Sequence, residues 1–170
     1  MPTNFYMFFV AGLIPLLIGA VYYHPRVLGS AWMRASGVTE ARIRTGNMAL
    51  IFGMVYVASV VLSFFLSGIV IHQGAAAQSM FPEAMEVGSE AHADLVAYTA
   101  AYGDRFRTFG HGFMHGLLTA VFFVLPIIAI IALFERRSSR YTFIHFGYWA
   151  ITLGLVGGLL CATLEYAVPG

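Results

Sequence analysis

Four long stretches of this chain contain no Asp, Glu, Lys or Arg, and they constrain the fold more than any other feature. They cover residues 1–24, 45–82, 108–134 and 141–164. Each exceeds the roughly 20 apolar residues that a helix needs to cross the ~30 Å hydrocarbon core of a bilayer. Only 10% of the residues are charged, against about 25% in soluble domains. We therefore expect a membrane protein with four transmembrane helices.

The predicted fold is an all-α, four-helix transmembrane bundle that forms a single domain over residues 1–170. The first apolar stretch is expected to be a retained span, because its apolar run is too long for a signal peptide and no small-x-small cleavage site follows it. Pro15 and Pro126 lie inside predicted spans and predict bends there, since proline removes a backbone donor. The spans are expected at about 4–23, 46–72, 108–134 and 142–168, with a connector over 73–107.

The connections between these spans differ in charge. Residues 24–46 carry a net charge of +3 and residues 135–141 carry +2, whereas residues 72–110 carry −3. Arginine-rich short loops stay on the cytoplasmic side of a membrane. We therefore expect the second connection and both termini to lie outside a bacterial cytoplasmic (inner) membrane.

All nine basic residues are arginines. Those of the inner loops are candidates for binding anionic lipid headgroups, at about 1 kcal/mol each near the surface. These candidates are Arg26, Arg136, Arg137 and Arg140. Nucleic-acid binding is not expected, because the basic residues are few and the topology explains them.

The outer connector contains a predicted amphipathic helix. Ser89 suits the N-cap position and Glu90 the first helical turn. The apolar side chains that follow recur at helical spacing, and they are Leu95, Tyr98, Tyr102 and Phe106. Such a helix is suited to lying on the outer membrane surface or covering the end of the bundle.

Small residues recur every four positions in the last two spans. Spans associate in lipid by close backbone packing through such residues. The two sets, Gly112, Gly116 and Ala120 in the third span and Gly154, Gly158 and Ala162 in the fourth, predict a tight antiparallel helix pair. The sequence leaves open whether they also serve a homodimer.

Ionisable residues are costly inside a membrane and therefore usually face the bundle interior. Four of them gather at the predicted outer ends of three spans, namely His72, His111, His115 and Glu165. His111 and His115 share one helix face, and Glu165 follows Gly158 by seven residues, on the side of the glycines. Three imidazoles and a carboxylate suit a transition metal such as Zn, Fe, Ni or Cu.

Other interpretations of the outer residues stay open. They could form a proton relay, because histidine titrates near neutral pH. They could contact a porphyrin, or they could be structural, with His115 and Glu165 as a hydrogen-bonded pair between helices. A second, inner group consists of His24, Glu135 and His145.

Two parts of the chain resemble a bacterial membrane family catalogued as domain of unknown function 1761. The first is YYHPRVLGSAWM at residues 22–33, and the second combines HGLLT at 115–119, LFERRS at 133–138 and GYW at 147–149. The resemblance covers the first, third and fourth spans and the inner loops, but not residues 74–110. It implies a small four-span membrane protein and assigns no catalytic residue.

Three classes of function remain open. The chain could be a non-enzymatic subunit or binding module, held in a homo-oligomer or a larger membrane complex; we favour this class because a bundle with short loops offers few chemical groups. It could instead bind a metal or cofactor through the outer histidines and Glu165, or form part of a transporter or channel. Four spans with short connections leave no room for a soluble catalytic domain, so an enzymatic activity is not favoured.

Overall fold

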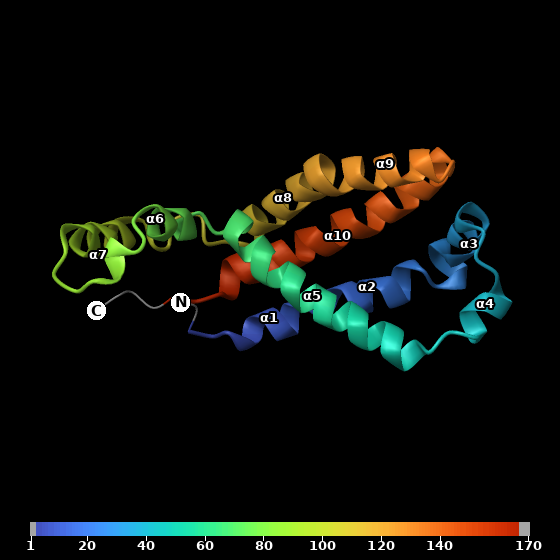
Figure 1. Cartoon of the computed structure of the whole chain (residues 1–170), viewed down its shortest axis with the longest axis horizontal. Coiled ribbons are helices and arrows are strands. Elements are labelled where there is room, and N and C mark those ends of the chain that lie inside the picture. The colour runs from blue at the N-terminus through green and yellow to red at the C-terminus, as the bar shows by residue number, and fades with distance from the viewer. Residues whose placement is uncertain (1–2, 167–170) are drawn as a thin grey trace.

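The computed structural model describes residues 3–166, and all regular secondary-structure elements in that range are helices. The predicted all-α class is therefore confirmed. Three continuous helical segments are long and apolar enough to cross a membrane: α5 (Met48–Val70), the run Phe109–Phe134, and α10 (Ser139–Thr163). They run along the long axis of the molecule (Figure 1). At 1.5 Å per residue each extends about 35–39 Å, enough for a bilayer core.

The run Phe109–Phe134 consists of three consecutive helical pieces. Helix α8 (Phe109–Thr119) leads into one π-helical turn, η3 (Ala120–Val124), and then into α9 (Leu125–Phe134). Pro126 lies in the first turn of α9, where the missing N–H of a proline is best tolerated. The π turn just before it accommodates the proline without ending the run.

The first apolar stretch is broken rather than continuous. Helix α1 (Tyr6–Ala11) stops at Gly12, and α2 (Ile14–Tyr22) starts two residues later with Pro15 in its first turn. The break agrees with the predicted bend, because the proline ring clashes with the carbonyl four residues earlier. A π turn, η1 (Pro25–Gly29), and helix α3 (Ser30–Ser36) then bend away by 55°. The chain thus has three candidate spans, or four if this bent stretch is one of them.

Helices α8 and α10 pack backbone against backbone. A Cβ atom on Gly157 would lie 2.5 Å from the carbonyl oxygen of Gly112. The predicted glycines Gly154 and Gly158 instead face aromatic rings, each with an imagined Cβ 2.7 Å from a phenylalanine side chain. The close helix pair is present, and the α10 backbone approaches α8 most closely at Gly157, opposite Gly112, and at Leu153, opposite Gly116.

Helix α5 contacts both helices of this pair and carries a buried row of serines that we did not predict. Ser59, Ser63 and Ser67 are spaced four residues apart and are buried. Their hydroxyls donate to carbonyls of their own helix, as Ser59 Oγ does to Val55 O at 2.7 Å. Small side chains satisfied in this way let neighbouring helices approach in lipid. The core at the centre of the bundle combines α1, α5, η3 and α10, with Phe8, Val70, Ala120 and Leu160 fully or almost fully buried.

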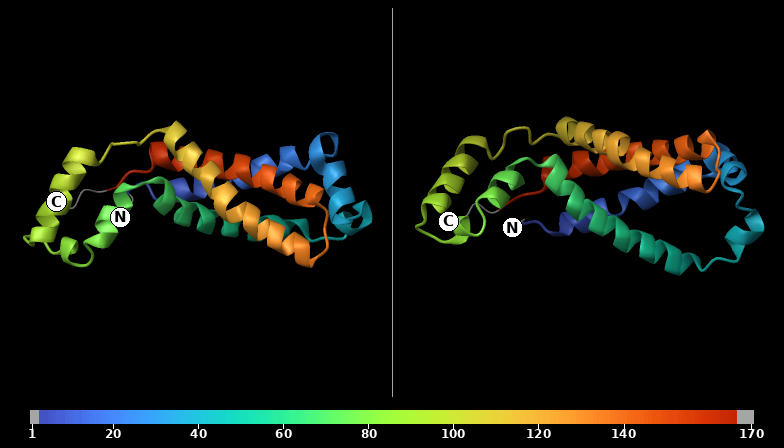
Figure 2. Two further views of the ribbon diagram at one scale, coloured as in Figure 1. Left: turned by 90° about the horizontal axis from the view of Figure 1, so that it is seen from above. Right: turned by 45° about the horizontal axis from the view of Figure 1, so that its top comes forward.

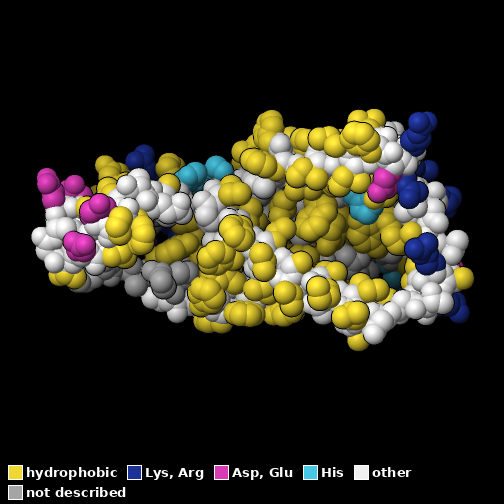
Figure 3. Space-filling model, viewed as in Figure 1, with side chains coloured by type: hydrophobic (Ala, Val, Ile, Leu, Met, Phe, Trp, Pro, Cys, Tyr) yellow, Lys and Arg dark blue, Asp and Glu magenta, His cyan; other side chains and the backbone are white. Residues whose placement is uncertain are grey.

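The connections lie at opposite ends of the molecule (Figures 1 and 2). Helices α3 and α4 (Glu40–Arg44) lie at one end with the turn between α9 and α10. The other end holds α6 (Gln73–Ser79), the 3-10 turn η2 (Glu83–Met85) and α7 (Glu90–Tyr102). Most arginines gather at the first end and most acidic side chains at the second (Figure 3).

The long connection contains a helix, α7, over Glu90–Tyr102, and Phe106 of the predicted apolar stripe lies beyond its end. Ser89 caps α7 by accepting a hydrogen bond from His92 N at 3.0 Å, and the helix ends at Tyr102 before Gly103. His92 is buried, and its Nδ1 lies 3.0 Å from Ala84 O, which fastens α7 to η2. Residues 73–107 thus contain three short helical pieces rather than one.

Two boundaries differ from the prediction for the fourth span. Helix α10 begins at Ser139, three residues before the expected start, and ends at Thr163 because Leu164 is extended (φ −73°, ψ 122°). Residues 167 and 168 of that predicted span lie outside the described residues.

Candidate metal centre

Helix α8 holds His111 and His115 on one face near its start. Thr108 caps the helix by accepting a hydrogen bond from His111 N at 3.3 Å. The glycines Gly112 and Gly116 are buried against α10. Because α8 is held against α10 by backbone contacts, the backbone positions of both histidines are fixed as well.

His72 reaches the same place from the corner between α5 and α6. Helix α5 ends at Val70, and Ile71 turns the chain (φ −115°, ψ 99°) so that His72 starts the next helix. Its Nε2 lies 3.0 Å from Nε2 of His111 and 3.3 Å from Nε2 of His115. One ligand nitrogen from each of the three histidines lies within 4.8 Å of the others. Figure 3 shows histidine side chains at the surface between the acidic end and the apolar belt.

Hydrogen bonds alone do not account for this arrangement. An imidazole nitrogen carries either one hydrogen or one lone pair, so His72 Nε2 cannot make two good bonds to two other ring nitrogens. A metal ion accepts a lone pair from each ring. Imidazole nitrogens bound at 2.0–2.1 Å to a tetrahedral zinc ion lie about 3.3–3.4 Å apart, close to the spacings around His72.

Glu165, the fourth predicted ligand, is not brought to this cluster. Within residues 3–166 the three histidines group without it, and no hydrogen bond joins it to His115. The expectation assumed that α10 continues to Glu165, but the helix ends at Thr163. The extended chain instead pairs with the N-terminal segment, where Glu165 N donates to Asn4 Oδ1 at 2.9 Å. In the described residues Glu165 therefore lies apart from the three-histidine group, and its role as a ligand stays a prediction.

The inner group of His24, Glu135 and His145 does not form a common site in the described part of the chain. His24 Nδ1 accepts from Arg26 N, and His145 Nδ1 lies 3.0 Å from the hydroxyl of Tyr23. Tyr23 also packs against Trp32 and Tyr148, with ring centroids 5.6 and 5.2 Å away. These residues form an aromatic cluster at the arginine-rich end.

Arg137 differs from the other inner-loop arginines named above. Its Nη1 donates to Ser36 O at 2.8 Å and its Nε pairs with Glu135 at 3.3 Å, so it ties the loop between α9 and α10 to α3. It therefore has a structural role whether or not lipid is bound.

A protein-family model described as "Protein of unknown function (DUF1761)" matches residues 6–161. The chain belongs to this family. The match confirms the resemblance and extends across residues 74–110, which the resemblance did not cover. No curated protein and no solved structure matches the chain.

In this DUF1761 protein, the loop before α8 supplies residues around the histidines that we did not predict as part of a site. Phe106, at φ 63°, stacks on His111 with centroids 5.2 Å apart and planes 16° apart. Cys161 Sγ lies 3.4 Å from the carbonyl oxygens of both Phe106 and Val70. Arg107 donates to Leu164 O and so holds the loop to the end of α10. In the sequence, Phe106 belongs to the apolar residues at helical spacing that follow Ser89. This pattern predicts the buried face of a helix, and it does not indicate a contact with a histidine.

Proposed function

We propose that this DUF1761 protein is a four-span protein of a bacterial cytoplasmic membrane that binds one transition-metal ion at its outer end. His72, His111 and His115 would be the protein ligands. The observation that carries the proposal is the convergence of three imidazole nitrogens from two separate helical segments, with 3.0 and 3.3 Å between His72 Nε2 and the other two.

The four-span topology supports an outer location for the site. The bent pair formed by Tyr6–Tyr22 and Pro25–Ser36 serves as the first span, beside the three long helical segments. The arginine-rich end then faces the cytoplasm, as short basic loops do, and Arg26, Arg136 and Arg140 would lie among inner-leaflet headgroups. The histidines are at the opposite, acidic end.

A ligand set of three imidazoles without a carboxylate favours particular metals. Neutral imidazole suits Zn, Cu, Fe and Ni. Three histidines leave one position of a tetrahedral site for water or another ligand, the arrangement of catalytic rather than structural zinc sites. His72 is exposed, so that position would be accessible.

We expect the purified protein in lipid nanodiscs to bind one equivalent of Zn²⁺ per chain. Metal analysis after dialysis against zinc would measure the stoichiometry, with Ni²⁺ and Cu²⁺ tested in parallel. The variant with all three histidines changed to alanine is the control and should retain none. Equal zinc retention by the two proteins would contradict the proposal.

We expect the two ends of the molecule to label from opposite sides of the membrane. Val87, 78% exposed beside α7, and Ala41 in α4 are suitable positions for single cysteines in a Cys161→Ala background. A membrane-impermeant maleimide should label Val87→Cys in intact spheroplasts and Ala41→Cys only after permeabilisation. The reverse pattern would place the histidines in the cytoplasm.

The subunit, homo-oligomer and transport functions stay predictions. The glycine faces of α8 and α10 pack against each other within one chain, so they supply no argument for self-association.

A further inference from the structure

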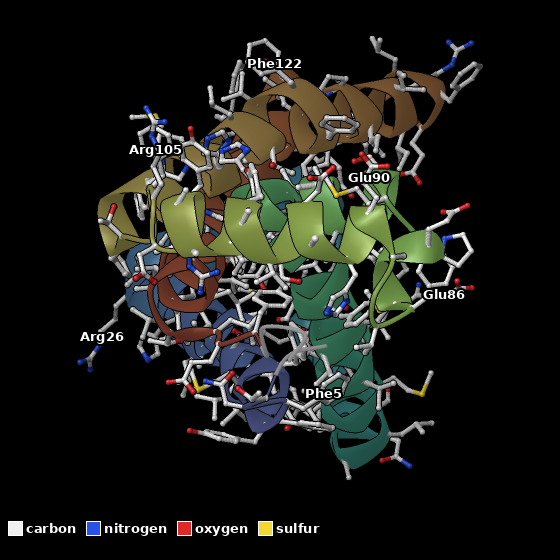
Figure 4. All side chains as sticks on the ribbon, turned by 90° about the vertical axis from the view of Figure 1, so that its left-hand side faces the viewer. Phe5, Arg26, Glu86, Glu90, Arg105 and Phe122 are labelled. Carbon is white, nitrogen blue, oxygen red and sulfur yellow. The ribbon has the colours of Figure 1, made fainter. Side chains whose placement is uncertain are left out.

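A pocket of about 430 Å³ opens directly beside the three histidines. It is lined by His72, Gln73, Tyr98, Tyr102, Arg105 and Phe106. Its volume falls within the roughly 300–1,000 Å³ of small-molecule sites. Helix α7 lies across this end of the bundle, with Arg105 at its α8 side and Glu86 and Glu90 at the other (Figure 4). The pocket shares His72 with the candidate metal centre.

Arg105 is the charged group of this pocket. Its guanidinium carbon lies 5.0 Å from the centre of the Phe106 ring and 5.8 Å from that of Tyr102. Within residues 3–166 no carboxylate lies within ion-pairing distance of it. An arginine held by aromatic faces with its N–H groups free is suited to binding a carboxylate through two parallel hydrogen bonds.

Gln73 holds the backbone segment 102–105, which carries Arg105, in place beside the pocket. Its Nε2 donates to Tyr102 O at 2.9 Å and to Arg105 O at 2.7 Å, joining the start of α6 to the segment after α7. Phe106, the next residue of the pocket lining, stacks on His111 of the candidate metal centre. Phe106 and His72 therefore link the pocket to the histidine group.

We propose that this pocket binds a small carboxylate with a flat apolar body. Arg105 holds the carboxylate, and the rings of Tyr98, Tyr102 and Phe106 contact the apolar body. The inference rests on the proposed function in one respect, since a metal ion held by the histidines would supply a second positive charge for the carboxylate.

Benzoate is the probe, titrated by calorimetry into the full chain in nanodiscs with and without zinc. We expect benzoate to bind the zinc-loaded protein, benzyl alcohol not to bind, and Arg105→Gln to weaken benzoate binding at least about tenfold, since hydrogen bonds to charged groups contribute this much. Arg34→Gln, an exposed arginine at the opposite end, is the matched control and should leave binding unchanged.

Zinc binding without benzoate binding, or equal benzoate binding by wild type and Arg105→Gln, would overturn this inference and leave the proposed function standing. Arg105-dependent benzoate binding by a protein that takes up no zinc would overturn the role of the metal ion and the proposed function, while supporting the arginine site.

Discussion

Replacing Gly116 with alanine is expected to reduce the free energy of unfolding by about 2–3 kcal/mol, the cost of overpacking a close contact. A Cβ atom at this position would lie 2.9 Å from Gly154 N and closer still to the carbonyl group of Leu153. These are backbone atoms of α10, which cannot rotate out of the way as a side chain can. The two helices must therefore separate, and this separation loosens the packing of α8 against α10. Circular dichroism during a denaturing-detergent titration would measure the effect.

Gly110→Ala is the matched control for this variant. Gly110 lies on the same helix, but a Cβ atom there meets nothing within 4 Å. Its replacement should be neutral or stabilise by up to about 1 kcal/mol, because alanine restricts the unfolded chain more than glycine does. Equal losses for Gly110→Ala and Gly116→Ala would show that the close contact with α10 is not the cause of the destabilisation, because alanine has the higher helix propensity at both positions.

Much of the architecture follows from local features of the sequence. Long charge-free stretches mark the candidate spans because charged groups are costly in hydrocarbon. The close pairing of α8 with α10 follows from the spacing of Gly112 and Gly116, since no other residue lets two backbones approach so closely. The pairing of His111 with His115 needs only a helix of regular period.

The details that failed depend on where helices end and how they are aligned. Glu165 was placed by continuing a helical period past Thr163, where the chain becomes extended. Gly157, not predicted, faces Gly112 because the relative shift of α8 and α10 is set by the whole interface. Hydropathy alone conceals the break at Gly12, since both α1 and α2 are apolar, and it was Pro15 that predicted a bend there.

The pocket could not be predicted from the sequence, for a different reason. Gln73 and Arg105 are 32 residues apart, and their contact is a single hydrogen bond from a side chain to a backbone carbonyl. No periodicity or motif marks such a contact. It becomes visible only when the end of α7 is placed against the start of α6.

Replacing His72 with alanine is expected to weaken zinc binding at least about 100-fold, whereas Glu165→Gln should leave it unchanged. His72 Nε2 is the nitrogen close to both other imidazoles, and without it only His111 and His115 remain as ligands. Losing an outer partner of a metal ligand already costs 10–100-fold in affinity, so losing a ligand should cost at least the upper value. Competition with a chelating dye would measure the zinc affinity of each variant.

The same pair of variants separates a metal site from a structural histidine cluster. If the histidines only pack and hydrogen-bond, His72→Ala should destabilise the metal-free protein, and zinc should not stabilise the wild type against unfolding. If they bind zinc, saturating zinc at 100 times its dissociation constant should stabilise the wild type by about 2.7 kcal/mol and leave His72→Ala almost unaffected. Glu165→Gln should behave as wild type in this measurement, because its segment contacts the N-terminal residues and not the histidines. A loss of zinc stabilisation in Glu165→Gln equal to that in His72→Ala would restore the four-ligand site predicted from the sequence.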